Sequence, residues 1–353
     1  MAGVLFFVRG VFLAGLVGLS GLSIAAFLGF ASPLLDALNH FQPIWFAGTL
    51  FSLLLVPFVF RKSASLRAVL ALAATGFLAS AVIVVPEIVS SWLTRPAIHL
   101  DRPVVKLMSR NLFGQNDKMA QVASDIAAED PDIIAFQEYF TEQRNELHRL
   151  IAQKYPFFVR CSGGRRAFLA IYSKTAFELS SDTLCPDSFS ERRDNIARLV
   201  ARFKDQSGQE FTIVNTQLNW PIQINPLFRS GLSITERLAG TYERKSGEWS
   251  ELAKAINAIK GPLVLVGDFN STPWSYALAR FEALTGLKRQ TRNLATYPKL
   301  LYWSGRWRET FPVLPIDHIF SRGDIGVYDV VAGKPAGSDH LPLIARFSVG
   351  AGG

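Results

Sequence analysis

Three long stretches without a charged side chain dominate the first part of this 353-residue chain. No Asp, Glu, Lys or Arg occurs in residues 10–35, 37–60 or 68–86. Each stretch reaches the roughly 20 residues that a helix needs to cross a bilayer, and a buried helix of a soluble protein rarely runs so far without a charge. We therefore predict three transmembrane helices, over about 10–30, 41–60 and 68–86. A cleaved signal sequence is the alternative for the first stretch, and the other two would then anchor the chain.

The basic residues between these stretches predict an orientation. Arg9 precedes the first stretch, the first connection "SPLLDALNHFQP" has no Lys or Arg, and the second connection carries Arg61, Lys62 and Arg67. The positive-inside rule places the N-terminus and the second connection in the cytoplasm. Residues after about 96 are then expected on the periplasmic or extracellular side of the membrane.

Net charge and cysteine content limit the function only weakly. The net charge of +8 is a mild basic bias, which suits anionic substrates or membrane headgroups without indicating either. The two cysteines, Cys161 and Cys185, are too few for a zinc-finger pattern. In an oxidising compartment they would form one disulfide, and two separate buried thiols are the alternative.

After the membrane region the pattern changes to short apolar strands. We predict a transmembrane region over 1–90, a linker over 91–102 and a domain over 103–349. Strand patterns include "VVKLMSRN", "IIAFQEY", "AFLAIYSK", "PLVLVGD" and "HLPLIARFSV", with helical spacing in "DKMAQVASDIAAEDPD", "TEQRNELHRLIAQKY" and "EWSELAKAINAIKG". Many strands with few helices between them predict an α+β fold with largely antiparallel sheets.

Polar side chains recur where these strands end. A turn explains any single case, and His318 is best explained as a core histidine, but the repetition needs a common cause. The residues concerned are Asn111, Glu138, Asn215 to Asn219, Asp268 and Asn270, with the Asp-His pairs Asp317-His318 and Asp339-His340. Carboxylates hold Mg²⁺, carboxamides bind phosphate, and an Asp-His pair forms an oriented base. Together these residue types predict metal-assisted phosphoester hydrolysis.

The ordered motifs "SRN", "PDIIAFQE", "LVGDFNSTPWS", "PIDHIF" and "GSDHLPL" resemble the endonuclease/exonuclease/phosphatase superfamily, the group of deoxyribonuclease I, and its membrane-anchored bacterial members. The resemblance covers about 103–349 and implies a four-layer α/β sandwich, here preceded by three transmembrane helices. It implies Mg²⁺ as cofactor, with Mn²⁺ as an alternative, and a phosphodiesterase or nuclease activity. The implied partners are the membrane and a nucleic acid, phospholipid or inositol phosphate substrate, with no obligate protein partner.

The resemblance assigns the metal and substrate sites residue by residue. It makes Glu138 the principal Mg²⁺ ligand and Asp339 a second carboxylate on the metal side. Asn111 lies beside the metal in this assignment and, with Gln217 and Asn219, contacts the substrate. Gln217 departs from the family pattern, because "NTQL" stands where many members have "NTHL". A glutamine binds phosphate but cannot donate a proton to the leaving group.

The catalytic roles fall on four further residues. Asp268 and Asn270 would position the attacking water and stabilise the phosphoryl group. His340 would be the general base or a phosphate contact, oriented by Asp317. The family divides over whether the aspartate or the imidazole deprotonates the water, and both assignments stay open here.

Two other classes of function fit the sequence less well. A non-catalytic binding module that keeps the fold is the alternative, supported only by Gln217. A channel is disfavoured, because Arg9, Asp36 and Glu87 lie at or beyond the margins of the three stretches and define no polar pathway. The connection 219–249 contains aromatic and basic residues, which suit nucleic-acid bases as well as lipid headgroups.

Overall fold

The computed structural model describes residues 2–61, 63–93, 102–163, 166–185, 196–221 and 247–350. The chain forms two compact units. The first contains the N-terminal helices up to Leu93 together with Thr272–Arg280, and the second contains the remainder of the described chain. Most of the predicted linker 91–102 lies outside the described residues.

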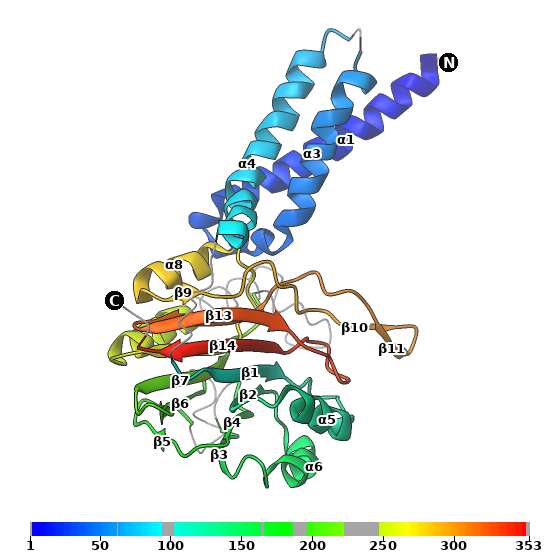
Figure 1. The fold of residues 1–353 in the computed structure, drawn as a ribbon. Coiled ribbons are helices and arrows are strands. Elements are labelled where there is room, and N and C mark those ends of the chain that lie inside the picture. Colours follow the sequence, from blue (N-terminus) through cyan, green and yellow to red (C-terminus); the bar gives the residue numbers. More distant parts are fainter. Residues whose placement is uncertain are drawn as a thin grey trace, which may run out of the picture. The chain divides into compact units, whose positions relative to one another are not determined.

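Three long helices make up most of the first unit. They are α1 (Ala2–Phe27), α3 (Gln42–Val59) and α4 (Leu66–Leu93), and a short helix α2 (Pro33–Asp36) lies in the first connection (Figure 1). All three are long and apolar enough to cross a membrane, as predicted from the sequence. Helix α4 continues through Pro86, beyond the predicted end of the third stretch, since helices in apolar surroundings tolerate an internal proline.

Small and polar side chains join these helices. The hydroxyl of Ser23 donates to the carbonyl of Gly76 at 2.5 Å, and a Cβ at Gly76 would lie 2.8 Å from the Cα of Ser20. Such close approach of small residues is typical of helix packing in membranes. Nε of Arg9 donates to the carbonyl of Val59 at 2.8 Å, so the start of α1 lies beside the end of α3.

The second unit is built from two six-stranded sheets (Figure 1). The first, in the order β13-β14-β1-β2-β4-β3, comprises β1 (Val105–Asn111), β2 (Ile133–Gln137), β3 (Phe157–Cys161), β4 (Leu169–Ser173), β13 (Ile325–Ala332) and β14 (Leu343–Val349). The second, in the order β5-β6-β7-β8-β12-β9, comprises β5 (Glu178–Leu179), β6 (Arg198–Lys204), β7 (Glu210–Gln217), β8 (Leu263–Asp268), β9 (Lys288–Arg289) and β12 (Asp317–Arg322). All pairs are antiparallel except β1 with β2 and β7 with β8.

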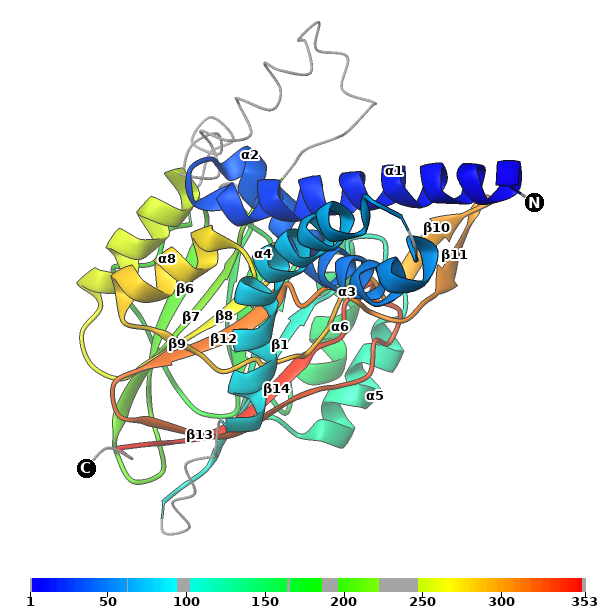
Figure 2. The ribbon, with the colours of Figure 1, turned by 90° about the horizontal axis from the view of Figure 1, so that it is seen from above.

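Side-chain alternation along the strands produces the layers. Leu107 and Ile133 point between the sheets, into a core shared with Ile213 and Val264 of the second sheet. Their neighbours, such as Ile134, point outward and pack on α5 (Met119–Glu129) and α6 (Thr141–Ile151). The second sheet is covered by the helix over 247–258, whose Trp249 stacks on Phe269 after β8, and by α8 (Tyr276–Thr285), whose Phe281 packs edge-on against Phe320 of β12. The predicted four-layer sandwich is confirmed (Figure 2).

Several features were not predicted by the strand patterns. Helix α8, strands β3, β5 and β9, and a separate hairpin of β10 (Leu300–Trp303) and β11 (Arg306–Glu309) had no clear periodicity. Cys161 and Cys185 form a disulfide with a Cα–Cα distance of 5.5 Å. The bond joins an edge strand of the first sheet to the chain that leads into β6, and the alternative of two separate thiols is excluded.

Candidate functional site

Strand direction brings the polar strand ends together. The parallel strands β1 and β2 have their C-terminal ends side by side, with Asn111 opposite Gln137. The parallel pair β7 and β8 ends in the same way, with Gln217 opposite Asp268. Strand β12 runs antiparallel to β8, so that it begins with Asp317 directly opposite Asp268. The site therefore lies where the ends of the central strands of both sheets meet.

Glu138 follows β2 and is held by three N–H donors. Its Oε1 accepts from the amide of Gln217 at 3.0 Å and from that of Asn111 at 3.4 Å, while its Oε2 accepts the backbone N–H of Gly114 at 3.0 Å. The backbone of Glu138 has a φ of 54°, a region that costs energy for a residue with a side chain. The strained backbone at Glu138 thus directs its carboxylate toward Asn111 and Gln217.

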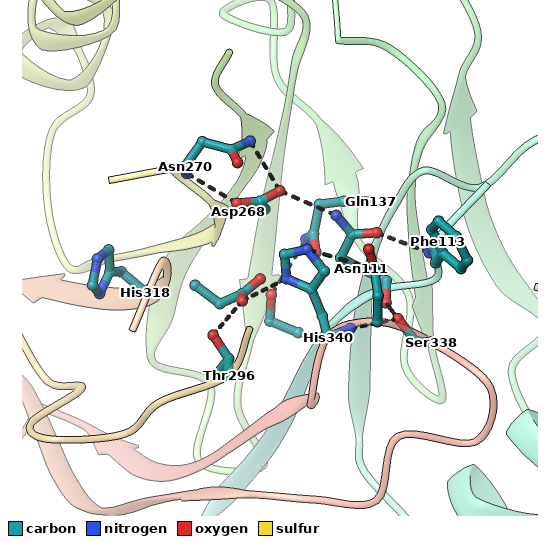
Figure 3. A network of polar contacts seen from close by, with 12 residues as sticks. Asn111, Phe113, Gln137, Asp268, Asn270, Thr296, His318, Ser338 and His340 are labelled. Carbon is teal, nitrogen blue, oxygen red and sulfur yellow. Dashed lines mark hydrogen bonds and ion pairs between the residues drawn. The ribbon is translucent and has the colours of Figure 1, made fainter. Parts of the chain in front are cut away.

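Asp268 lies at the centre of the network (Figure 3). Its Oδ2 accepts from the side-chain amides of Asn111 at 3.1 Å, Gln217 at 3.2 Å and Asn270 at 3.1 Å, and its Oδ1 accepts the backbone N–H of Asn270 at 2.9 Å. The preceding Gly267 is required by packing, since a Cβ there would lie 1.8 Å from the carbonyl oxygen of β7. The "GDFN" stretch therefore places Asp268 and Asn270 in a buried hydrogen-bond network with Asn111 and Gln217, which a simple turn would not need.

His340 and Asp317 form a buried pair. Nδ1 of His340 contacts Oδ2 of Asp317 at 2.8 Å, and the hydroxyl of Thr296 donates to the same oxygen at 2.5 Å. Ser338 fixes the loop, because its hydroxyl accepts the N–H of His340 at 3.1 Å and donates to the end of β1. Single ligand atoms of Asp268, Asp317 and His340 lie within 4.8 Å of one another. Since the pair already uses two of them, we interpret the group as an oriented imidazole and not as a metal centre.

Burial and crowded charge shift the pKa values of this cluster. Burial raises the pKa of Asp268 to about 6, opposed by His340 and reinforced by Asp317. Burial also raises the pKa of Asp339 to about 7, opposed by His340 and reinforced by Glu138. Burial lowers the pKa of His340, but the surrounding carboxylates outweigh it and raise the value to about 10. The site concentrates negative charge away from water, which a bound cation would offset.

The donors on the metal side fit a hard divalent cation. Glu138 and Asp339 offer carboxylate oxygens, the ligands that Mg²⁺ and Mn²⁺ prefer. Among the described residues, Oδ1 of Asp339 is buried and accepts no hydrogen bond, and it lies 3.9 Å from Nε2 of His340. A buried oxygen of this kind needs a cation or a water. The oxygen of Asn111 accepts the N–H of Phe113 at 2.9 Å, so in this arrangement Asn111 orients the carboxylates through its amide N–H.

Aromatic side chains form a rim beside His340; Trp220 belongs to the connection 219–249 noted in the sequence, whereas no motif marks Tyr297. The ring of Tyr297 lies 4.9 Å from that of His340 and 5.3 Å from that of Trp220. The hairpin β10–β11 lies near Asn111, because Trp307 packs edge-on against Phe113 with ring centroids 5.0 Å apart, and the backbone N–H of Phe113 donates to Asn111. Thr296 and Tyr297 lie in "NLATYPK", a stretch with no strand or helix periodicity to draw attention to it.

Three sequence candidates have other partners. His318 is a core histidine, as expected, since its Nε2 donates to the carbonyl of Ser271 at 2.7 Å. Asn215 joins the sheets by accepting from Gln137 at 2.7 Å. Asn219 accepts from Arg166 at 2.9 Å, so its role in substrate binding stays a prediction. Most of the connection 219–249 lies outside the described residues.

A four-layer sandwich with carboxylates, amides and an oriented imidazole at its facing strand ends defines a class, the phosphoester hydrolases of α/β-sandwich type. Over residues 111–340 the sequence matches the Endonuclease/Exonuclease/phosphatase family, and the chain belongs to that family.

Individual relatives are distant. A "UPF0294 protein" of Vibrio campbellii is 31% identical over 107 residues, which are 30% of this chain and 35% of that protein, so the match spans about a third of the relative's length. The structure of an endonuclease/exonuclease/phosphatase from Bacteroides vulgatus is 19% identical with a TM-score of 0.52, covering 70% of this chain and 99% of that one. The structure of beta toxin from Staphylococcus aureus is 15% identical with a TM-score of 0.50, covering 68% and 99%. At these identities the two structures show the shared fold alone.

Proposed function

We propose that the chain is a Mg²⁺-dependent phosphodiesterase or nuclease tethered to the outer face of a membrane. The observation that carries the proposal is the convergence of Glu138, Asp268 and the Asp317–His340 pair at one edge of the two sheets. Family membership supports phosphoester hydrolysis in general. The domain division proposed is a transmembrane region over 1–90, a linker over 91–102 and a hydrolase domain over 103–349.

Each residue has a role in this proposal. Glu138 and Asp339, with Asn111 beside them, would hold Mg²⁺ or Mn²⁺, which when bound offsets the negative charge of the phosphoryl oxygens. Asp268, held by side-chain amides, orients the attacking water, and Asn270 supports that carboxylate.

The proton of the attacking water would pass to Asp268 or, in the neutral form of the ring, to Nε2 of His340. The carboxylates that raise the pKa of His340 to about 10 favour the protonated ring, and so favour Asp268 as the base. Asp317 fixes the imidazole through Nδ1, which leaves Nε2 to face the substrate. Gln217 contacts both Glu138 and Asp268, so it replaces the family histidine as a positioning group and supplies no acid. Protonation of the leaving group then falls to water or to His340.

Two observations support the proposed side of the membrane. A disulfide between Cys161 and Cys185 is typical of an oxidising compartment. Asp36, in the first connection, accepts a hydrogen bond from Ser275, so this connection and residue 275 lie on the same side. Because the first connection has no basic residue and the second has several, the positive-inside rule makes that side non-cytoplasmic. A reporter fused after residue 95 is expected to be active only if it reads the exported side, and activity of a cytoplasm-specific reporter there would overturn the topology.

The rim favours a substrate with a flat or apolar group beside its phosphate. Tyr302 is 61% and Trp303 is 70% exposed on β10, and the adjoining β11 carries the exposed Arg306 and Arg308. Exposed aromatic rings stack on nucleotide bases or lie among lipid headgroups, while the guanidinium groups attract phosphate. A nucleic acid or a phospholipid therefore fits this rim better than a free inositol phosphate.

The test uses the full chain, purified in detergent or reconstituted in nanodiscs. DNA, RNA, phospholipid vesicles, inositol phosphates and bis(p-nitrophenyl) phosphate are offered with Mg²⁺, with Mn²⁺ and with EDTA. We expect hydrolysis that EDTA abolishes, and loss of that activity in Glu138→Ala, because the variant removes the main charge that holds the ion. Wild-type rates in both Glu138→Ala and His340→Ala would show that the site is wrong.

Two further variants assign the base. Asp268→Asn and His340→Gly are each expected to lower turnover by at least about a hundredfold, the usual scale for losing a general base. Added imidazole restores His340→Gly only if the ring transfers a proton. If the wild type hydrolyses no phosphoester and Gln217→His does, the chain is a binding module that has kept the fold.

A further inference from the structure

The connection between the first two membrane helices binds the start of α8. Asp36 is 6% exposed, and its carboxylate accepts the hydroxyl of Ser275 at 2.9 Å and the backbone N–H groups of Tyr276 at 2.8 Å and Ala277 at 3.0 Å. The amide of Asn39 also donates to it at 2.8 Å. Both oxygens of this buried carboxylate are therefore satisfied.

Asp36 accepts hydrogen bonds from the first backbone N–H groups of α8. The first N–H groups of a helix have no partner within the helix, and a side chain just before the helix usually accepts them. Here the acceptor comes from a distant part of the chain. A carboxylate suits this position, since its negative charge is also stabilised by the positive end of the helix dipole. Asp36 thus caps the N-terminus of α8, although it lies in the connection between α1 and α3 and not next to α8 in the sequence.

Two further contacts fix the same segment. Nδ1 of His40 lies 3.1 Å from the hydroxyl of Thr272 and accepts the backbone N–H of Thr272 at 3.2 Å. The hydroxyl of Tyr276 donates to the carbonyl of Phe27, at the end of α1, at 2.9 Å. Residues 272–277 are therefore held at both ends by the membrane region.

The segment is joined to the site by a very short piece of chain. Thr272 follows Asn270 by two residues, and Asn270 provides two of the hydrogen bonds that hold Asp268. Ser271, between them, is fully buried, and its carbonyl accepts from His318 at 2.7 Å. One residue therefore separates the contacts of Thr272 from the hydrogen bonds of Asn270 that hold Asp268.

We propose that Asp36 is a positioning residue for catalysis, because it holds residues 275–277, and the chain leads from them through Thr272 directly to Asn270 of the site. The inference rests on the proposed phosphoester hydrolysis. A displacement of about 1 Å at a reacting group costs about a hundredfold in rate, which sets the expected effect. The metal-side residue Glu138 and the substrate rim belong to other strands and loops, so ion and substrate binding should be spared.

The experiment compares Asp36→Ala and Asp36→Asn with the wild type, as full-length protein in nanodiscs. We expect kcat for bis(p-nitrophenyl) phosphate to fall about 10- to 100-fold, with KM and the Mg²⁺ concentration for half-maximal activity changing less than about threefold. The matched control is Leu34→Ala in the same connection, which is 43% exposed and should keep wild-type kinetics. Ser275→Ala should lower kcat alone and add little to Asp36→Ala, because both remove the same contact.

A second readout does not depend on catalysis. In Asp36→Ala the amide hydrogens of Tyr276 and Ala277 should exchange with solvent faster, while those of β8 keep their protection. Faster exchange with unchanged kcat would overturn the positioning role and leave the proposed function intact. Unchanged exchange would refute the contact itself. A wild type without any phosphoester hydrolysis would remove the proposed function, and this inference with it.

Discussion

Replacement of Asp317 by asparagine isolates the charge of the buried pair. The substitution keeps the shape of the side chain and an oxygen that can accept from Nδ1 of His340 at the observed 2.8 Å. Both partners are almost fully buried, so solvent cannot replace the lost charge. A hydrogen bond to a charged group is worth about 1.5–3 kcal/mol and a broken buried pair costs about 3–5 kcal/mol, which suggests a loss of about 2–4 kcal/mol here.

If the whole of that loss falls on the transition state, kcat drops about 30- to 1000-fold, at 1.36 kcal/mol for each factor of ten. The assay is the initial rate of Mg²⁺-dependent hydrolysis of the best substrate of the panel, with thermal unfolding to verify that Asp317→Asn is folded. Asp329→Asn is the matched control, because it makes the same change in an exposed pair with Arg346, worth at most about 1 kcal/mol. A folded Asp317→Asn protein within threefold of the wild-type kcat would refute the role of the pair.

Four other changes have defined outcomes. Gln217→His should keep kcat within about threefold, since an imidazole N–H still reaches one carboxylate; a hundredfold loss would contradict this. Cys161→Ser should lower the free energy of unfolding by about 2–4 kcal/mol, measured by denaturant titration, and reductant should then change the wild type but not the variant. Burial lowers the pKa of His318 well below 6.5, so the unfolded state takes up the proton at a higher pH than the folded state does. Below pH 6.5 the free energy of unfolding of the wild type should therefore fall by about 1.4 kcal/mol per pH unit relative to that of His318→Gln. At pH 8 the two proteins should show the same pH dependence. Trp303→Ala should lower kcat/KM about tenfold or more for a nucleic acid or phospholipid and leave an inositol phosphate unaffected, and equal losses for all would exclude stacking.

The part of the site that could be predicted lies at the ends of apolar strands. Glu138 and Asp268 follow runs of buried residues, where a carboxylate has no structural reason to occur, and their motifs stand in the family order. Sequence alone does not give strand register, so the placement of Asp317 opposite Asp268 needed the structure. The three long apolar helices were predictable for a simpler reason, because each sequence stretch without charge is about as long as a helix that spans a bilayer.

The part that could not be predicted depends on contacts between distant segments. From the sequence, Asp36 is only a polar residue at the margin of an apolar stretch. The fold shows that its carboxylate accepts the first N–H groups of α8. Thr296 and Tyr297 are uncharged and lie in an irregular stretch, so no periodicity marks them. The exposed aromatic residues of β10, such as Trp303, have the composition of a buried strand, and burial cannot be read from composition.

The position of β14 has a consequence for synthesis of the protein. Strand β14, which comes latest in the sequence among the described strands, lies between β13 and β1, with Phe347 opposite Val105. The first sheet therefore stays open between β13 and β1 until residues 343–349 have been synthesised. Contacts between such distant residues form slowly, and unpaired strand edges are prone to aggregate during the delay. Removal of residues 343–349 should leave the first sheet unable to close, so that aggregation and proteolysis, and not intrinsic activity, would decide the fate of the domain.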